Sequence, residues 1–284
     1  MSVVVTGATG HLGRLVVEAL LDGGLPPADI VAAGRSVEKI ADLAARGVRV
    51  AAIDYTRPDT LVAAFTGADA VLLVSGSEVG RRVAQHANAI EAAKTAGVGR
   101  IVYTSAPRAD TSPLILAPEH KATEELIRAS GLPFTILRNG WYTENYAGSL
   151  EQARATGELV ASVGEGLVAS ASRADYAAAA ARVLTSPGHE GKVYELSGDR
   201  AWGHAELAAV IAEIVGRPVT YREVTPEEHL AELTGAGLDE GTAGFVVALD
   251  GNTRDGLLAE TTGELTALIG RPTTPLAEGL RAAA

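Results

Sequence analysis

The chain has 284 residues, of which 47% are apolar, and its 35 acidic and 24 basic residues give a formal net charge of −11. This acidic balance, without any basic run, argues against nucleic acid and anionic membranes as partners, so we expect small-molecule partners. The absence of cysteine excludes disulfide bonds, thiolate metal sites and cysteine nucleophiles. The chain begins directly with a strand pattern and no segment has the apolar length of a membrane span, which indicates a cytoplasmic protein.

Short apolar runs rich in β-branched residues alternate with longer helical patterns in the first half of the chain. The predicted strands are 3–6, 30–33, 48–53, 70–74, 101–104 and 134–137, and helical patterns cover 12–21, 37–45 and 81–96. This alternation predicts parallel strands with helical crossovers, that is, a doubly wound α/β sheet of Rossmann type. The strands are nearly all apolar, as expected when helices cover both faces of the sheet.

The rhythm changes after about residue 145. A polar region, an alanine-rich helix at 175–184, a strand at 193–196 and helical pieces broken by prolines follow. We therefore expect an NAD(P)-binding Rossmann domain at 1–145 and a smaller substrate-covering region at 146–284. The second region is expected to return to the Rossmann sheet near 173–197.

Three glycines separate the first predicted strand from the first predicted helix. Gly7 would allow the sharp turn, Gly10 would let a pyrophosphate approach the backbone, and Gly13 would let the helix pack close to the strand. The phosphates would then lie at the positive end of the helix. A turn of purely structural use is the alternative, but the strand-turn-helix context favours dinucleotide binding.

The end of the second predicted strand indicates which dinucleotide is bound. An NAD site usually places an acidic residue about 20 positions after the glycine motif to bind the ribose hydroxyls. Here the sequence reads AAGRS, so Arg35 occupies this region and Lys39 follows one helical turn later. A guanidinium suits a 2′-phosphate, which favours NADP, although Arg35 on a solvated loop is the alternative. Asp54 and Tyr55, after the third strand, would lie beside the adenine or form an ordinary turn.

Several segments together carry a family resemblance. TGATGHLG, AGRSVEK, SGSEVG, YTSAPRADTSPL and LRNGWYTENY resemble the NmrA-like atypical short-chain dehydrogenases, and most closely the type 2 NAD(P)H:quinone oxidoreductases. The similarity continues through SRADYAAAAARVL, GHEGKVYELSGD and LIGRPTTPLAE, so it covers essentially the whole chain. The resemblance implies quinone reduction by NADPH without a flavin, and a related group reduces triarylmethane dyes.

We expect Lys121 to contact the cofactor through hydrogen bonds to a ribose. The glycine motif, the resemblance and this lysine together give the set of expected cofactor-binding residues. They are Gly7, Ala8, Thr9, Gly10, His11, Leu12, Gly13, Arg35, Ser75, Gly76, Ser77, Thr104, Lys121, Asn139, Gly140, Trp141, Tyr142, Thr143, Glu144 and Arg173. The segments 7–12, 75–77 and 139–144 each follow a predicted strand, where a doubly wound sheet binds its ligands. Arg173 instead begins a later helix, and an ordinary surface arginine is the alternative there.

The catalytic pair of ordinary short-chain dehydrogenases is missing. These enzymes use Tyr-x-x-x-Lys to exchange a proton with an alcohol or carbonyl. Here Ala117 stands four residues before Lys121, and no Tyr-x-x-x-Lys occurs in the chain. A quinone needs less help, because hydride addition forms an aromatic ring. Catalysis can then consist mainly of holding the nicotinamide face-on to the quinone.

Aromatic side chains cluster where a substrate would lie. Trp141, Tyr142 and Tyr146 fall within six residues of a chain that is 4% aromatic. Flat faces suit a flat quinone, and a small core cluster is the alternative. The catalytic candidates are His120, Tyr142 and Asn145, although a structural role is the alternative for His120 and Asn145, and the family fixes no general acid. The remaining histidines show no ligand spacing, so we expect no metal.

Two functions from different classes fit these observations. The first is an NADPH-dependent reductase that transfers a hydride directly to a quinone or, within the same enzyme class, to a triarylmethane or azo dye. The second is a non-enzymatic NADP-sensing regulator of NmrA type. The aromatic segment GWYTENY favours the enzyme, because a sensor does not need a flat substrate slot. The sequence leaves the oligomeric state open.

Overall fold

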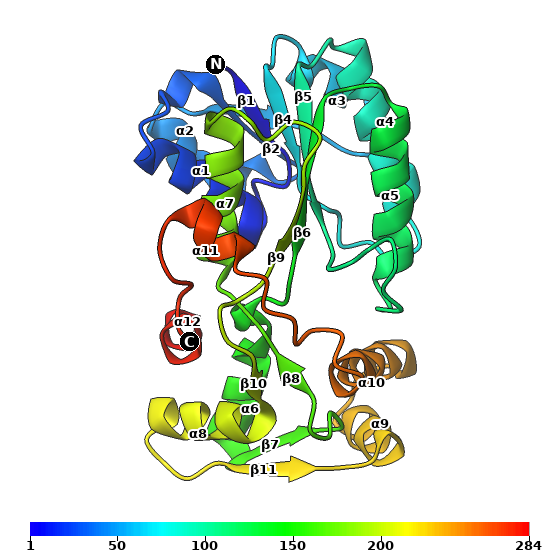
Figure 1. Ribbon diagram of the computed structural model, residues 1–284, viewed down its shortest axis with the longest axis vertical. Coiled ribbons are helices and arrows are strands. Elements are labelled where there is room, and N and C mark those ends of the chain that lie inside the picture. The colour runs from blue at the N-terminus through cyan, green and yellow to red at the C-terminus, as the bar shows by residue number, and fades with distance from the viewer. Residues whose placement is uncertain (284) are drawn as a thin grey trace.

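The computed structural model describes residues 1–283, and its larger lobe is built on a seven-stranded sheet (Figure 1). The strands, all parallel, lie in the order β3-β2-β1-β4-β5-β6-β9. They are β1 Val3–Val5, β2 Ile30–Gly34, β3 Arg49–Ala52, β4 Ala70–Leu73, β5 Arg100–Ser105, β6 Phe134–Asn139 and β9 Val193–Leu196. The predicted doubly wound α/β fold is therefore confirmed.

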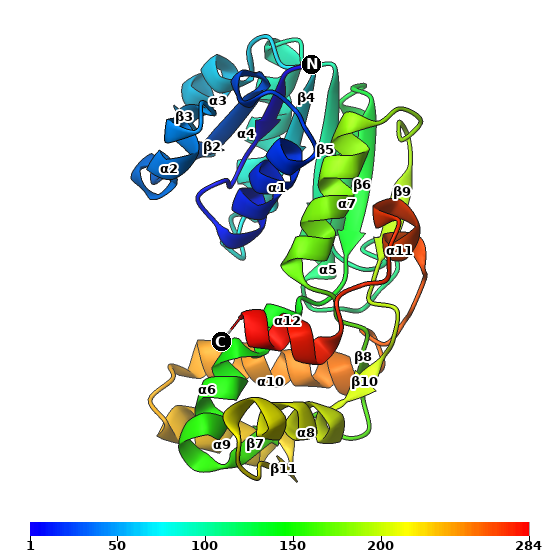
Figure 2. The same cartoon turned by 90° about the vertical axis from the view of Figure 1, so that its left-hand side faces the viewer.

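Helices cover both faces of this sheet (Figure 2). On one face lie α1 His11–Asp22, α2 Ala41–Ala45, α7 Arg173–Thr185 and α11 Glu264–Ile269; on the other lie α3 Pro58–Phe65, α4 Arg82–Thr95 and α5 Ala117–Ala129. Helix α1 shows how the sequence produces this layering. It buries Leu12, Val16, Val17 and Leu20, which lie on one face at helical spacing, against the sheet.

The helical pattern predicted at 37–45 is interrupted. The structure has a 3₁₀ turn at Val37–Ile40 followed by the short helix α2. Ile40 leaves helical geometry, with φ −122° and ψ 25°, and it is buried in the core cluster on this face of the sheet. The break lets this β-branched side chain turn inward, a tertiary contact that the local pattern does not encode.

The smaller lobe consists of helices and two short sheets. It contains η3 Thr143–Tyr146, α6 Ala147–Thr156, β7 Glu158–Ala161, β8 Leu167–Val168, β10 Trp202–Gly203, α8 His204–Val215, β11 Thr220–Glu223, α9 Pro226–Gly235, α10 Glu240–Arg254 and α12 Leu276–Ala282. Strand β7 pairs with β11 in parallel, and β8 pairs with β10 in antiparallel fashion. Leu150, Leu159, Trp202 and Leu207 belong to its separate hydrophobic core.

The chain passes between the two lobes repeatedly. After the first visit to the smaller lobe, α7 returns to pack against α1, and β9 pairs with β6 at the edge of the large sheet. After the second visit, α11 packs against α7. Within residues 1–283, no helix combines the length and the apolar character that crossing a bilayer requires.

Candidate functional site

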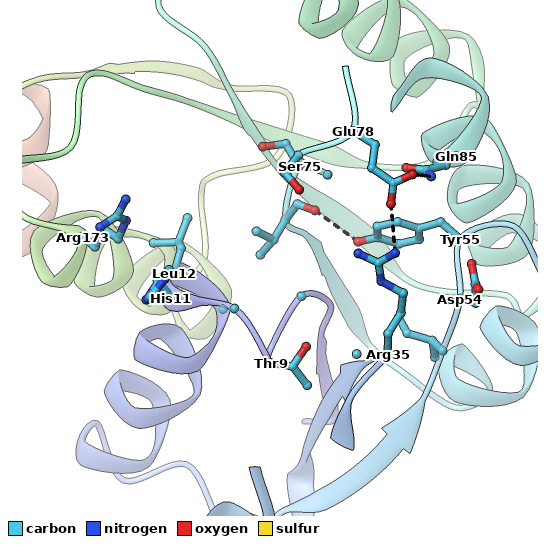
Figure 3. A pocket seen from close by; sticks show the side chains of 18 of the residues that line it. Thr9, His11, Leu12, Arg35, Asp54, Tyr55, Ser75, Glu78, Gln85 and Arg173 are labelled. Carbon is cyan, nitrogen blue, oxygen red and sulfur yellow. Dashed lines mark hydrogen bonds and ion pairs between the residues drawn. The ribbon is translucent and has the colours of Figure 1, made fainter. Parts of the chain in front are cut away.

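A cleft of about 420 Å³ opens beside the carboxyl ends of the strands, next to the point where the strand order reverses between β1 and β4 (Figure 3). Open α/β sheets bind ligands at such a switch point. The sequence-predicted residues that line the cleft are Gly7, Thr9, Gly10, His11, Leu12, Gly13, Arg35, Asp54, Tyr55, Ser75, Gly76, Ser77, Tyr142 and Arg173. The fold thus brings together segments that are far apart in the sequence.

The turn between β1 and α1 forms the floor of one part of the cleft. Gly7 adopts φ +62°, and the N–H of Gly10 donates to the Gly7 carbonyl at 2.9 Å. A Cβ on Gly13 would lie 2.4 Å from the Gly7 oxygen, so only glycine permits this packing. No side chain caps α1, and its first turn holds no acidic residue. Its positive end and free N–H groups are therefore available to an anion.

Gly34, at the end of β2, is a lining residue that the sequence analysis missed. A Cβ at this position would lie 2.7 Å from two side-chain atoms of Thr9. The glycine therefore allows the end of β2 to approach the turn after β1. The signal was present in the sequence, since Gly34 directly precedes the arginine singled out there.

Arg35 lies at one end of the cleft, with 67% of its side chain exposed. Its Nη1 lies 2.9 Å from Oε1 of Glu78, on the loop after β4 (Figure 3). The other carboxylate oxygen of Glu78 accepts a hydrogen bond from Nε2 of Gln85 at 3.0 Å. Glu78 and Gln85 also line the cleft. The sequence analysis missed both, because it assigned only residues 75–77 of the segment SGSEVG to the site.

Asp54 and Tyr55 lie in the lining, and both are already engaged by the protein. The Asp54 carboxylate accepts hydrogen bonds from the backbone N–H and hydroxyl of Thr56, which lower its pKa against the opposing effect of desolvation. The Tyr55 hydroxyl donates to Thr6 Oγ1 at 2.7 Å. Burial raises the pKa of Tyr55 to about 12. The tyrosine therefore acts as a neutral wall of the cleft.

The loop at 75–77 is fixed by side chains behind it. Thr104 lies outside the lining, but its Oγ1 accepts the backbone N–H of Ser75 at 2.9 Å. The Gly76 N–H donates to Nε2 of His86 at 3.0 Å, and the Gly76 carbonyl accepts from Nε of Arg82 at 2.7 Å. The three contacts fix the backbone of this wall.

Tyr142 and Arg173 form the opposite end of the cleft. The Arg173 guanidinium lies 5.0 Å from the centre of the Tyr142 ring, and the backbone N–H of Arg173 donates to the Glu144 carboxylate at 2.8 Å. Asn139 donates to the Tyr142 hydroxyl at 3.3 Å, and its own Oδ1 is buried without a hydrogen-bond partner. Nη2 of Arg173 donates to Asn145 Oδ1 at 2.8 Å. Asn145 itself is exposed and does not line the cleft.

The remaining predicted residues lie elsewhere. Ala8 is fully buried, and Thr143 bonds the hydroxyl of Ser170 within the protein. Gly140 and Trp141 line a second cavity of about 30 Å³, between β9 and the loop that follows α10. Lys121 is exposed on α5, so the ribose contact expected for it stays a prediction.

His120 is buried rather than exposed to the cleft. Its Nδ1 lies 2.8 Å from the Tyr103 hydroxyl, and burial together with the positive charge of Arg82 lowers its pKa to about 3. Burial also raises the pKa of Tyr103 above its usual value. Both groups are therefore neutral near pH 7, and a protonated imidazole is not available from His120 at that pH.

Known proteins resemble this chain along its whole length. A family model described as NAD(P)H-binding matches residues 7–187. The chain is 47% identical over 278 residues to quinone oxidoreductase 2 of Escherichia coli strain K12, covering 98% of this chain and 97% of that protein. The crystal structure of the NADPH-dependent quinone oxidoreductase QOR2 from Escherichia coli, complexed with NADPH, superposes with a TM-score of 0.94 at 46% identity, covering 99% of both chains. The Citrobacter sp. triphenylmethane reductase complexed with NADP(H) gives a TM-score of 0.94 at 39% identity, covering 100% of both chains.

Proposed function

Because the chain belongs to the NAD(P)H-binding, NmrA-like family, we propose that it is an NADPH-dependent reductase that transfers a hydride directly to a quinone without a flavin. This membership confirms the resemblance inferred from the sequence motifs. The observation that carries the proposal is the cleft at the switch point of a chain that is 47% identical, nearly end to end, to a quinone oxidoreductase.

The residues of the cleft fit a phosphorylated dinucleotide. The packing of Gly13 on Gly7 leaves room for a pyrophosphate at the uncapped end of α1. Arg35 presents a guanidinium fork that suits a 2′-phosphate. NADPH, when bound, supplies the hydride.

The two ends of the cleft give the cofactor a direction. Arg35 lies at one end and Arg173 at the other (Figure 3). With the 2′-phosphate at Arg35, the nicotinamide half extends toward Tyr142 and Arg173. The Tyr142 ring contacts both the Arg173 guanidinium and the ring of Tyr176, whose centre lies 5.2 Å away. Tyr142 thus offers a fixed aromatic wall near the expected reaction centre.

Positioning is the main task that this chain performs in the reaction. Hydride addition to a quinone forms an aromatic ring and leaves an oxyanion that water can protonate, so the reaction does not require the missing tyrosine. The burial of His120 and its low pKa agree with a site that lacks a strong internal acid. The acceptor is accordingly a quinone or a related aromatic electron acceptor. A cytoplasmic location suits this role, because NADPH is regenerated inside cells.

NADPH oxidation with a panel of benzoquinones, naphthoquinones, triarylmethane dyes and azo dyes tests the proposal. We expect acceptor-dependent oxidation with sequential kinetics, because both reactants must occupy the site together, and a purified protein without visible absorbance. Parallel-line kinetics or a stoichiometric yellow flavin would contradict direct transfer. Strong activity with dyes alone would move the substrate to the dye class, which the likeness to triphenylmethane reductase supports. Tight NADPH binding without turnover of any acceptor would indicate the sensor.

A further inference from the structure

The guanidinium expected at the 2′-phosphate already has an anionic partner within the protein. Nη1 of Arg35 and Oε1 of Glu78 are 2.9 Å apart, and both residues line the cleft. Arg81 lies 3.7 Å from the other carboxylate oxygen. A carboxylate and a phosphate monoester are both oxyanions that bind an arginine fork through the same N–H groups.

Glu78 is held at this place by the fold. Gln85, which is buried at the start of α4, donates to the second carboxylate oxygen at 3.0 Å. The loop on either side of Glu78 is anchored as well: His86 and Arg82 bind the backbone of Gly76, and the Glu119 carboxylate accepts the N–H of Gly80 at 2.8 Å. The position of the acidic group is therefore a property of the loop rather than of one mobile surface chain.

We propose that Glu78 limits the selectivity for NADPH over NADH, because it competes with the 2′-phosphate of NADPH for Arg35. This inference rests on the proposed function, in which Arg35 faces that phosphate. A phosphate that binds Arg35 must displace the carboxylate or accept a like charge beside it, and both lower the affinity for NADPH. NADH has no 2′-phosphate and escapes this competition. Glu78 thus reduces the difference in affinity between NADPH and NADH that Arg35 creates.

The size of the effect follows from exposure. The Arg35 side chain is 67% exposed and that of Glu78 is 31% exposed, so solvent screens the pair. Exposed ion pairs change equilibria by a few-fold rather than by orders of magnitude. We expect Glu78→Gln to tighten the binding of a 2′-phosphorylated nucleotide by about 3- to 5-fold. The gain should shrink as salt concentration rises.

Nucleotide fragments test this competition without any turnover. Calorimetric titration of the whole protein with adenosine 2′,5′-bisphosphate and with 5′-AMP compares two ligands that differ only in the 2′-phosphate. Glu78→Gln should tighten the bisphosphate by the stated factor and leave 5′-AMP within about twofold. Glu151→Gln is the matched control, since it removes the same charge from an exposed ion pair on α6, with Arg154. It should change neither titration.

Three results would overturn the inference. The first is an unchanged affinity of Glu78→Gln for the bisphosphate, and the second is an equal gain in affinity for both nucleotides. The third is a lower melting temperature without a change in binding, which would mean that the ion pair is only structural. Failure of every quinone to be reduced would leave the inference intact, because no quinone enters the titration. Wild-type protein that binds neither nucleotide would instead contradict the proposed cofactor site itself.

Discussion

The imidazole of His86 accepts a hydrogen bond from the backbone N–H of Gly76, with 3.0 Å between the nitrogens, so a fully buried side chain on α4 supports one wall of the cleft. Acceptance at Nε2 places the ring proton on Nδ1, which lies 3.0 Å from Thr123 Oγ1. The Thr123 hydroxyl in turn donates to the carbonyl of Glu119 at 2.9 Å. The arrangement requires a neutral imidazole.

Replacing this imidazole tests its role in the wall. His86→Ala leaves the N–H of Gly76 without its acceptor and opens a cavity, so the free energy of unfolding should fall by about 2–4 kcal/mol. NADPH affinity should fall as well, because the loop loses its anchor. Urea unfolding and NADPH titration measure the two effects. His86→Gln offers a carbonyl acceptor in place of Nε2, and failure of this variant to recover part of the affinity would count against the hydrogen bond.

Buried histidines also predict how stability depends on pH. Burial lowers the pKa values of His86 and His120 to about 3, from the 6.5 of an unperturbed histidine. The unfolded chain therefore binds more protons below pH 6.5, and the free energy of unfolding should decrease as the pH falls from 6.5 toward 3. At pH 5 each imidazole should lower the free energy of unfolding by about 2 kcal/mol relative to pH 7. Urea unfolding at both pH values checks this, and the double variant His86→Gln, His120→Gln should lose most of this dependence.

Arg35→Ala tests cofactor choice directly. It should weaken NADPH binding by about 1.5 kcal/mol, the lower end of the range for hydrogen bonds to charged groups, because the guanidinium is exposed and already paired. NADH should bind almost as before. Dissociation constants for both cofactors, measured by quenching of protein fluorescence, decide the matter. Equal losses of affinity for NADPH and NADH would mean that the 2′-phosphate does not bind at Arg35.

The close packing of α1 on its own turn predicts a sharp cost for one methyl group. Gly13→Ala would place a Cβ 2.4 Å from the Gly7 oxygen, so the helix must move away. We expect a loss of about 1–3 kcal/mol in stability and a marked loss of nucleotide binding. Gly244→Ala within α10 is the control, since a Cβ there meets nothing within 4 Å. It should stabilise the protein by about 0.5–1 kcal/mol, and similar unfolding curves for both variants would refute the packing argument.

The inner strands β1, β2, β4, β5 and β6 were predictable from sequence because they are buried on both faces and are largely apolar. The 139–144 segment shows what the sequence pattern does not predict, namely the direction in which each side chain points. Trp141 and Tyr142 are neighbours in the sequence and were expected to share a slot, yet Tyr142 lines the large cleft and Trp141 lines the small cavity. Tyr142 has extended backbone angles, with φ −84° and ψ 131°, and side chains of successive extended residues point to opposite sides.

Glu78 and Gln85 illustrate a second limit. Glu78 meets Arg35, and Gln85 of α4 meets Glu78, only because the loop after β4 turns toward the end of β2. No hydrophobic period marks such a loop. Ile40 illustrates the same limit within the core, since the cluster in which it is buried draws residues from several elements that are distant in the sequence. Local patterns predict which segments become strands, whereas contacts between loops depend on how those strands are finally arranged.

The repeated passage of the chain between its lobes has a consequence for how the protein can be cut and recombined. The smaller lobe is assembled from separate stretches, and α7 and β9 run back to α1 and β6 between them. A protease that nicks one connecting loop should therefore leave both fragments associated under native conditions. For the same reason the smaller lobe cannot be transplanted as one contiguous cassette, and chimeras with altered acceptor specificity require several coordinated crossover points.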